Sequence, residues 1–386
     1  MDVIYLDNNA TTHPDPRVVE AVCAAMADVA GNPASGHAEG RRALSAVDLA
    51  REQVADVLEV SPSRVLFTAG ATESNNIAIC GAWRAAREAG SSRRRIIVGA
   101  TEHPSALEAA RSLVAEGADI VELAVTPQGL PDMRALEALI DDTTLLVSLL
   151  GANNETGVLT AVRQAADTAH ASGALFHSDI TQMMGRVPVD VYALGLDLAS
   201  ISGHKFHGPK GVGALFVDTG VPVVGVYLGG GQEKGLRPGT LNVPGIVGLG
   251  QACARVDEFI GRSAHVEYLR ELLVASIQRG YSPVTVNGDG SPRLPNTANI
   301  RLAGVDGDAL VASTPSVAFS TGSACSSAAP SPSHVLTAMG LTESEASECV
   351  RFSLSVHTTD ADVVHACEAI LESARRLRGL ASEGAA

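Results

Sequence analysis

The chain has 386 residues, of which 46% are hydrophobic and 18% are charged, so it is long enough to bury more than one domain core. Its 28 basic and 43 acidic residues give a net charge of −15, which leaves no basic surplus for binding nucleic acid directly. No segment approaches the roughly 20 apolar residues of a membrane span, and the first residues lack the pattern of a secretory leader. These properties exclude a membrane protein and predict a soluble, cytoplasmic protein.

The six cysteines are far apart in the sequence, with neither the C-x-x-C spacing of a zinc site nor the density of a disulfide framework. We therefore expect free thiols and no metal centre. Four of the cysteines fall in apolar helical patterns and are expected to be small core residues: Cys23, Cys80, Cys253 and Cys367.

The first 14 residues are predicted to form an extended arm that carries Asn8, Asn9 and Thr11. Apolar residues at three- and four-residue spacing then predict helices over 14–29 and 40–58. Beyond them strands alternate with helices. The predicted strands cover 65–68, 96–99, 120–125, 145–149, 174–179, 196–201 and 213–217. Of the predicted helices, two end near residues 89 and 116, and two cover 133–140 and 162–172. Such alternation indicates an α/β fold with a mostly parallel sheet and helices on both faces.

A long helical region is predicted over 244–280, and the elements after it are shorter. They comprise strands over 297–302, 317–320 and 350–355, and helices over 307–313, 333–339 and 360–377. This pattern predicts a second, smaller α+β domain. We place the large domain at 15–260 and the small domain at 1–14 and 261–386.

Residues 199–211 read Ala-Ser-Ile-Ser-Gly-His-Lys-Phe-His-Gly-Pro-Lys-Gly, which places Lys205 where a strand ends in a glycine-rich loop. The neighbouring His204 and His207 can lower the pKa of this amine, and such an amine can form a Schiff base with an aldehyde. Taken alone, the stretch fits an ordinary surface lysine in a turn at least as well.

The segment 174–182 is a short predicted strand that ends in Asp179 and Gln182. Ligands of α/β proteins gather at the carboxyl ends of strands. Pyridoxal 5'-phosphate (PLP) needs a lysine for its aldehyde and a carboxylate for its pyridinium nitrogen. Lys205 and Asp179 are therefore candidates for one PLP site.

Seven segments strengthen this interpretation when they are taken together and in order. They are Leu-Asp-Asn-Asn-Ala-Thr-Thr at 6–12, Gly-Ala-Thr-Glu-Ser-Asn at 70–75, Thr-Glu-His at 101–103, Asn-Asn-Glu-Thr-Gly at 153–157, His-Ser-Asp at 177–179, Ser-Gly-His-Lys at 202–205 and Gly-Ser-Ala-Cys-Ser-Ser at 322–327. From Tyr5 to about Leu377 the chain resembles the cysteine desulfurases of the NifS/IscS type, PLP enzymes of the class V aminotransferase group. The resemblance implies fold type I of the PLP-dependent transferases, with a seven-stranded sheet in the large domain, and a homodimer.

The stretch 70–72 lies between a predicted strand and a predicted helix, where backbone N–H groups and a threonine hydroxyl can hold a phosphate. A simple helix cap is the alternative. The resemblance implies that this stretch binds the cofactor phosphate together with other segments, one of them in the partner subunit. The residues so implied are Gly70, Ala71, Thr72, Ser202, His204 and, from the partner subunit, Thr240.

His103 follows a strand end, where helix capping or packing is the plain alternative; the resemblance implies that it stacks on the pyridine ring and assists proton transfer. Gln182 and Asn154 have alternatives as turn amides. The resemblance implies that Gln182 binds the ring hydroxyl and that Asn154 lies near both the cofactor and the substrate carboxylate. We expect structural roles for His177, His207 and Lys210.

Alternation over 350–354 puts Arg351 and Ser353 on one face of a predicted strand. Arg351 can then hold a carboxylate in a cleft through two parallel bonds, or simply lie at an edge. The resemblance implies that Arg351 binds the carboxylate of the amino-acid substrate, with Asn154 and Asn9 beside it.

Cys325 lies among serines, prolines and small residues, over about 321–333, a composition typical of a mobile loop. The resemblance implies that its thiolate attacks the sulfur of L-cysteine, keeps that sulfur as a persulfide and passes it to an acceptor protein, while L-alanine is released. The catalytic residues implied are Cys325, Lys205 and His103.

Two departures from the family pattern affect these expectations. Ile180 stands where the family has alanine, which should alter packing only, and the last residues lack the aromatic-bearing tail with which iron–sulfur members engage their scaffold. The acceptor therefore stays open between iron–sulfur cluster assembly, DNA phosphorothioation, tRNA thiolation and a nitrogenase-type system. Two rival functions also stay open: selenocysteine lyase or another reaction of this enzyme group, and a non-enzymatic adaptor of a sulfur pathway.

Overall fold

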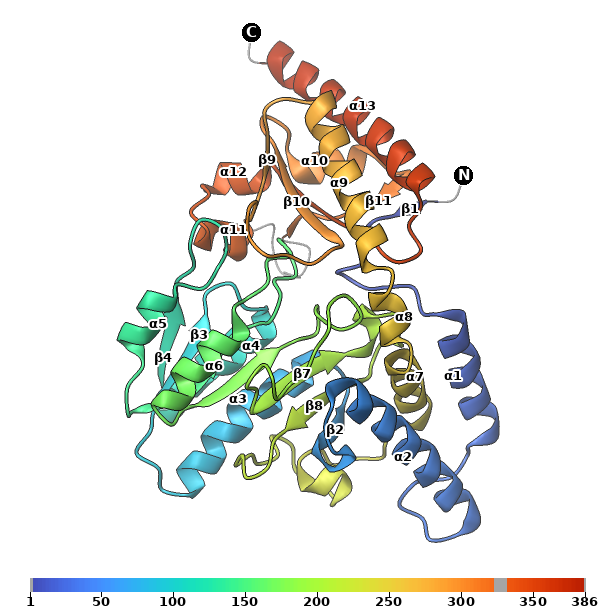
Figure 1. Cartoon of the computed structure of the whole chain (residues 1–386), viewed down its shortest axis with the longest axis vertical. Helices are drawn as coiled ribbons and strands as arrows, with labels where there is room; N and C mark the ends of the chain where they lie inside the picture. Colours follow the sequence, from blue (N-terminus) through green and yellow to red (C-terminus); the bar gives the residue numbers. More distant parts are fainter. Residues whose placement is uncertain (1–2, 323–331, 385–386) are drawn as a thin grey trace.

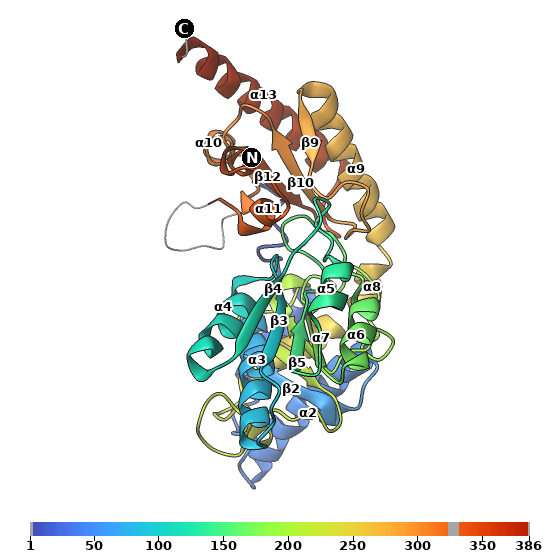
Figure 2. The ribbon, with the colours of Figure 1, turned by 90° about the vertical axis from the view of Figure 1, so that its left-hand side faces the viewer.

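The computed structural model describes residues 3–322 and 332–384, which form a larger lower part and a smaller upper part in Figure 1. The larger part is built on a seven-stranded sheet, and the smaller part on a three-stranded sheet. Both ends of the chain lie in the smaller part (Figure 1, Figure 2). Across the described ranges, no helix has the length and apolarity needed to cross a bilayer.

The large sheet has the strand order β2-β8-β7-β6-β5-β3-β4. Its strands are β2 (Val65–Thr68), β3 (Arg95–Gly99), β4 (Asp119–Leu123), β5 (Thr144–Ser148), β6 (Leu175–Asp179), β7 (Leu198–Ser202) and β8 (Gly213–Val217). Strand β8 runs antiparallel to both of its neighbours, while the pairs from β7 to β4 are all parallel. The predicted α/β fold with a mostly parallel, seven-stranded sheet is confirmed.

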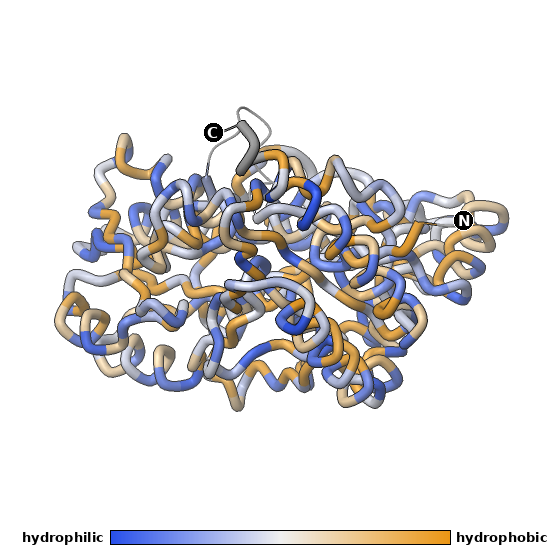
Figure 3. The backbone as a smooth tube through the Cα atoms, turned by 90° about the horizontal axis from the view of Figure 1, so that it is seen from above, coloured by the Kyte–Doolittle hydropathy of each residue, from blue (hydrophilic) through white to orange (hydrophobic). Residues whose placement is uncertain are grey.

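Helices cover both faces of this sheet. They are α1 (Pro16–Asp28), α2 (Ala38–Leu58), α3 (Ala71–Glu88), α4 (Pro104–Ser112), α5 (Met133–Leu139), α6 (Val162–Ala171) and α7 (Val243–Cys253). Because side chains alternate along a strand, Ile97 packs in one core with α1, α2, α5, α6 and α7, while Ile96 and Val98 pack on the other face with α3 and α4. Burial on both faces explains the nearly continuous apolar runs of these strands. Over the whole chain, hydrophobic and hydrophilic stretches are mixed along the backbone (Figure 3).

The smaller part contains β9 (Val284–Val286), β10 (Thr297–Leu302) and β12 (Cys349–Ser353), with β10 in the middle and antiparallel to both. Its helices are α9 (Ser263–Gly280), α10 (Gly307–Ser313), α11 (His334–Ala338), α12 (Glu343–Ser347) and α13 (Asp360–Gly384). Strand β1 (Ile4–Tyr5) pairs in parallel with β11 (Val317–Ala318), and Leu6 enters the core under the small sheet. The domain boundaries at 14 and 260 stay a prediction, which these two separate cores support.

The chain between the two parts differs from the sequence prediction. The region expected as one helical stretch over 244–280 is divided into α7, α8 (Val256–Ile260) and α9. Val256 of α8 packs in the core of the large sheet, whereas Val266 of α9 packs in the core of the small sheet, so the breaks let successive helices face different cores. Helix α13 extends to Gly384, past the expected end at 377.

Short elements were missed. Strands β1 and β9 have two and three residues and helix α12 has five, which is too short for a periodic pattern to show. The single-turn 3-10 helices are η1 (Pro62–Arg64), η2 (Leu113–Glu116), η3 (Gly203–Lys205) and η4 (Gln232–Gly235). The expectation for Cys23 was wrong: its thiol is exposed, because Val18 and Ala25 form the buried side of α1 and Cys23 falls on the other side.

Leu6→Ala should lower the free energy of unfolding by about 2–5 kcal/mol, because it removes a fully buried side chain from the small core. Val3→Ala is the matched control, since Val3 lies on the same arm with 57% of its surface exposed and should have almost no effect. Urea denaturation followed by circular dichroism measures both. If the two variants were equally stable, the arm would not contribute to the small core.

Candidate active site

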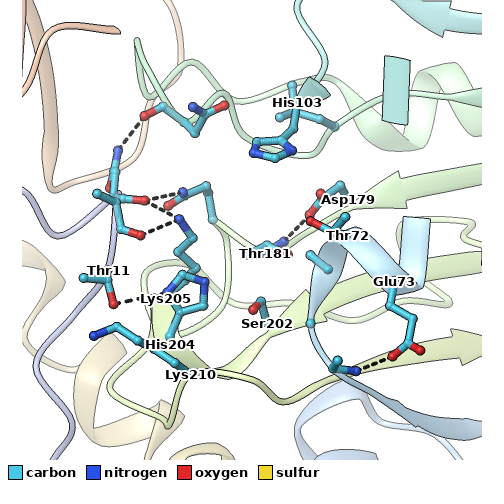
Figure 4. Close-up of a pocket in the computed structure, with 18 of the residues that line it drawn as sticks. Thr11, Thr72, Glu73, His103, Asp179, Thr181, Ser202, His204, Lys205 and Lys210 are labelled. Carbon is cyan, nitrogen blue, oxygen red and sulfur yellow. Dashed lines mark hydrogen bonds between the residues drawn. The ribbon is translucent and has the colours of Figure 1, made fainter. Parts of the chain in front are cut away.

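A cavity of about 760 Å³ opens where strands β6 and β7 end and helix α3 begins (Figure 4). Parallel strands bring their carboxyl ends to one edge of a sheet, so side chains that follow different strands meet there. Among the predicted site residues, those on the wall of this cavity are Asn9, Gly70, Ala71, Thr72, His103, Asn154, Asp179, Gln182, Ser202, His204 and Lys205. Arg351 and Thr240 are not on this wall, and Cys325 lies outside the described residues.

Lys205 is bound by backbone carbonyls of the N-terminal arm. It is the last residue of η3, directly after β7. Its Nζ donates to the carbonyl oxygens of Asn9 and Ala10, at 2.7 Å each (Figure 4). The contact with Ala10 joins residues 195 positions apart, so no local pattern in the sequence indicates it.

A chain of hydrogen bonds links Asp179 to His103. One carboxylate oxygen of Asp179 accepts from the N–H of Thr181 (3.0 Å) and the other from Nδ2 of Asn75 (2.8 Å). The same Nδ2 donates to Oγ of Ser105 (2.9 Å), which lies 2.8 Å from Nδ1 of His103. Sequence analysis assigned no role to Asn75 or Ser105. Asn75 ends the segment 70–75 that carries the family resemblance, whereas the signal for Ser105 is only its position at the start of α4.

The imidazoles of the cavity are neutral near pH 7. Burial lowers the pKa of His103, an effect that Asp179 opposes and that Lys205 reinforces. Burial and the charge of Lys205 lower the pKa of His204 to about 4. Nδ1 of His103 accepts the N–H of Ser105 at 3.2 Å, so the neutral ring carries its proton on Nε2.

Helix α3 begins without a capping side chain. Its N-cap is Gly70, with a φ of 148°. The backbone is tightly packed here, since a Cβ added to Gly213 of β8 would lie 2.7 Å from Cα of Gly70, and a Cβ on Gly70 would lie 3.3 Å from Oγ of Ser202. The first-turn N–H groups and the hydroxyls of Thr72 and Ser202 therefore form a close-fitting cradle, in which the helix dipole favours an anion.

Thr240 lines a second cavity beside the main one. Glu73 and Tyr227 line both cavities. Glu73 accepts from Nε of Arg237 at 3.1 Å, which ties the segment that carries Thr240 to the start of α3. The role predicted for Thr240 involves a partner subunit, and it stays a prediction.

Arg351 does not line the cavity but contacts the main chain of Asn154, which does. Its Nη2 donates to Oδ1 of Asp7 (2.6 Å) and to Oγ of Ser320 (2.7 Å), and its Nη1 donates to the carbonyl oxygen of Asn154 (3.1 Å). That oxygen also accepts Nδ2 of Asn9 (3.0 Å). Nε of Arg351 is buried and has no partner among residues 3–322 and 332–384. The predicted alternation is present, because the neighbours of Arg351 in β12 pack in the small core.

Two of the three residues expected to be structural are buried in hydrogen-bond networks. His177 pairs with two serine hydroxyls at 2.8 and 3.0 Å, and burial lowers its pKa to about 4. Nδ1 of His207 pairs with the carbonyl oxygen of His13 at 2.9 Å. Lys210 differs, because it lines the main cavity (Figure 4).

Comparison with known proteins identifies the family. The model of the aminotransferase class-V family matches residues 4–365. A cysteine desulfurase of Frankia sp. (strain EuIK1) is 43% identical over 394 aligned residues, which cover 98% of this chain and 93% of that protein. A solved NifS-like protein superposes with a TM-score of 0.88 at 36% identity, covering 96% of this chain and 99% of that one. A structure described as SspA in complex with cysteine has a TM-score of 0.81 at 34% identity, covering 92% and 99%.

These matches extend over almost the whole chain and agree in sequence and in fold, which confirms the family that the seven segments predicted. The chain belongs to the cysteine desulfurases, within the class-V aminotransferase family of PLP-dependent enzymes.

Proposed function

We propose that this enzyme converts L-cysteine to L-alanine with PLP as cofactor, and passes the sulfur through its own thiol to an acceptor protein. The observation that carries the proposal is that a single cavity joins an amine, a carboxylate, a neutral imidazole and an open helix N-terminus. These are Lys205, Asp179, His103 and the start of α3. PLP needs an amine for its aldehyde and a carboxylate for its ring nitrogen, a helix N-terminus suits its phosphate, and a neutral imidazole can transfer protons.

The cavity wall fits PLP at each polar part of the cofactor. The cradle around Gly70 suits a phosphate, and the Asp179 carboxylate, oriented by two N–H donors, suits the ring nitrogen. We assign the other contacts to Lys205 for the aldehyde carbon, His103 for the ring face, Gln182 for the ring oxygen, and Ala71, Thr72, Ser202 and His204 for the phosphate, with Asn154 beside the ring. When bound, PLP supplies an electron sink that stabilises negative charge at the substrate α-carbon.

Lys205 and His103 are the proton-handling groups in this proposal. Two carbonyl acceptors orient Nζ of Lys205 at the cavity, and in its unprotonated form this amine takes the proton from the substrate α-carbon. His103 is neutral because burial lowers its pKa, and its proton lies on Nε2, the ring nitrogen that Ser105 does not engage. It is therefore able to assist proton transfer without adding a charge to the cavity.

We assign the substrate carboxylate to Arg351, with Asn9 and Asn154 beside it. The buried Nε of Arg351 is a donor without an acceptor in the described part of the chain. A substrate carboxylate would compete with Asp7 for this guanidinium, because Asp7 already holds Nη2 at 2.6 Å. In this proposal, the ion pair with Asp7 keeps the guanidinium of Arg351 oriented before the substrate binds.

We assign the nucleophile to Cys325, which the family motif indicates. Burial raises the pKa of the four buried thiols, to about 11 for Cys349 and Cys367. Thiols so buried stay protonated at neutral pH and are poor nucleophiles. In the transfer step, Sγ of Cys325 bonds to the substrate sulfur as the Cβ–S bond breaks and its electron pair goes to Cβ. A proton added at Cβ and a proton returned to the α-carbon by Lys205 then give L-alanine, and the sulfur stays on Cys325 as a persulfide.

We further propose a homodimer that shares its sites, with Thr240 of one subunit reaching the cavity of the other. The shared lining residues Glu73 and Tyr227 support this, because they connect the Thr240 segment with the phosphate end of the main cavity. The free cysteines of the described ranges agree with a reducing, cytoplasmic compartment. The net charge of −15 favours a protein as sulfur acceptor, whether it serves iron–sulfur assembly, DNA phosphorothioation or tRNA thiolation.

Lys205→Ala should abolish the visible absorption of the PLP-loaded protein and slow alanine formation by about 10²- to 10⁴-fold, because no other amine occupies its position. The chain has three lysines, Lys205, Lys210 and Lys234, and Lys210 lines the same cavity. Lys210→Ala is therefore the matched control and should keep the absorption. Undiminished alanine formation by the Lys205 variant would assign the base to a different residue.

Asp179→Asn should weaken PLP binding about tenfold or more, because a neutral amide loses the charge-assisted hydrogen bond to the ring nitrogen. Asp197→Asn is the control, since Asp197 lies just before β7, accepts the N–H of Phe176 at 2.7 Å and is not on the cavity wall. Absorbance titration with PLP measures both affinities. An equal loss in the two variants would point to a general effect on folding.

Cys325→Ser should keep the visible absorption and still bind L-cysteine, but it should form no persulfide, because a serine hydroxyl is scarcely ionised near neutral pH. Cys23→Ser changes an exposed thiol on α1 and should behave like the wild type. Mass spectrometry after brief exposure to cysteine should find added sulfur on the peptide that contains Cys325. Added sulfur on Cys23 or Cys349 instead would transfer the nucleophile's role to that residue.

A further inference from the structure

The guanidinium of Arg186 is buried beside the turn that carries Lys205, here called the lysine turn (Gly203–Lys205). Arg186 is 8% exposed and follows Gly185, whose φ of 69° reverses the chain at the end of the turn after β6. Burial, with added repulsion from Arg351, lowers the pKa of Arg186 to about 9, so the group stays protonated at neutral pH. No carboxylate pairs with it within residues 3–322 and 332–384. A buried cation is costly unless hydrogen bonds compensate it.

Neutral oxygens of three separate segments provide that compensation. Nη1 of Arg186 donates to the backbone carbonyl (2.8 Å) and to Oε1 (2.5 Å) of Gln182. Nη2 donates to the carbonyl oxygens of Lys205 (3.1 Å) and Asn8 (3.4 Å). Arg186 therefore ties together the arm, the turn after β6 and the lysine turn.

These bonds determine which way the Gln182 amide faces. A guanidinium can only donate, so the atom of Gln182 that faces Arg186 must be its oxygen. Nε2 then points the other way and donates to the carbonyl oxygen of Asn9 at 3.1 Å. That is the one acceptor that the described structure provides for Nε2, which carries two hydrogens, and Gln182 lines the main cavity. The second N–H is thus left for an acceptor inside the cavity.

We propose that Arg186 is a positioning residue: it presents the second N–H of Gln182 to an anionic oxygen bound in the cavity and holds the Lys205 main chain beside it. The fitting ligand group is the ring oxygen of PLP, which is an acceptor when ionised. Because this role presupposes PLP in the cavity, it rests on the proposed function. The other charged or titratable groups close to Arg186 are Arg351, Lys205 and His207.

The proposed contact has a spectroscopic consequence. With PLP bound at Lys205, an N–H of Gln182 donated to the ring oxygen would stabilise the anion of that oxygen and would lower the pH at which the visible absorption changes. Removing Arg186 frees the Gln182 side chain and weakens that donor. The pH midpoint of the visible absorption change should therefore rise.

The experiment compares PLP-loaded variants by absorbance across pH and by PLP affinity. Arg186→Met and Gln182→Leu should each raise the midpoint by about one pH unit, a tenfold change in the proton equilibrium, and each should weaken PLP binding several-fold. The double variant should resemble Gln182→Leu alone, because both changes act through one contact. Arg270→Met is the matched control: Arg270 is 3% exposed and donates to the carbonyl oxygen of Leu294 at 2.8 Å, away from the cavity, so the midpoint should not move.

An unchanged midpoint in Arg186→Met, or additive shifts in the double variant, would overturn the proposed role. If circular dichroism shows that Arg186→Met does not fold, Arg186→Lys replaces it in the experiment. An ammonium cannot contact both the Gln182 and the Lys205 oxygens as the planar guanidinium does, so the pH midpoint of this variant should also rise. An unchanged midpoint in Arg186→Lys would overturn the role. A wild-type protein that binds PLP without any visible band would overturn the proposed function itself. A normal band in the wild type with no shift in Gln182→Leu would overturn the positioning role alone.

Discussion

The backbone of the N-terminal arm is the constraint on which the rest of the site depends. Carbonyl oxygens of Asn8, Asn9 and Ala10 accept the hydrogen bonds of Lys205, Gln182 and Arg186. The same arm continues into strand β1 and the core under the small sheet. The position of the Lys205 amine is therefore coupled to the packing of the smaller part, although Lys205 and Ala10 are 195 residues apart in the sequence.

Desolvation, more than ion pairing, determines the charges around the cavity. Burial neutralises His103 and His204 by lowering their pKa values. It also raises the pKa of Glu102, whose Oε1 accepts the N–H of Leu150, and raises the pKa of Glu155 to about 7. The charged side chains that remain on the cavity wall are Lys205, Asp179, Lys210 and Glu73, and Glu73 is already paired with Arg237. The neutral imidazoles therefore add no charge that a charged ligand would have to balance.

Much of the fold was predictable because buried strands leave a strong local signal. The bounds of β2, β8 and β10 agree with the predicted strands, since each has a short run of apolar residues between turn residues. Elements of two to five residues, such as β1 and α12, carry no such signal. The division of the helical region at α8 could not be predicted from local pattern either. It depends on which of the two cores each helix packs against, and those cores are formed by residues far apart in the sequence.

The same distinction applies to the site. The sequence by itself determined where the candidate residues lie along the chain, because Lys205, Asp179 and the Gly70 turn each follow a strand that local pattern can locate. Their roles in the chemistry were predicted only when the family resemblance was added to that pattern. Only the tertiary structure decided how these groups are oriented. Asn75 links Asp179 to Ser105, and Arg186 turns the Gln182 amide, through hydrogen bonds whose partners come from separate elements. Such hydrogen bonds depend on the distance and direction between donor and acceptor as well as on residue type. Those distances and directions are set only when the sheet brings its strand ends together.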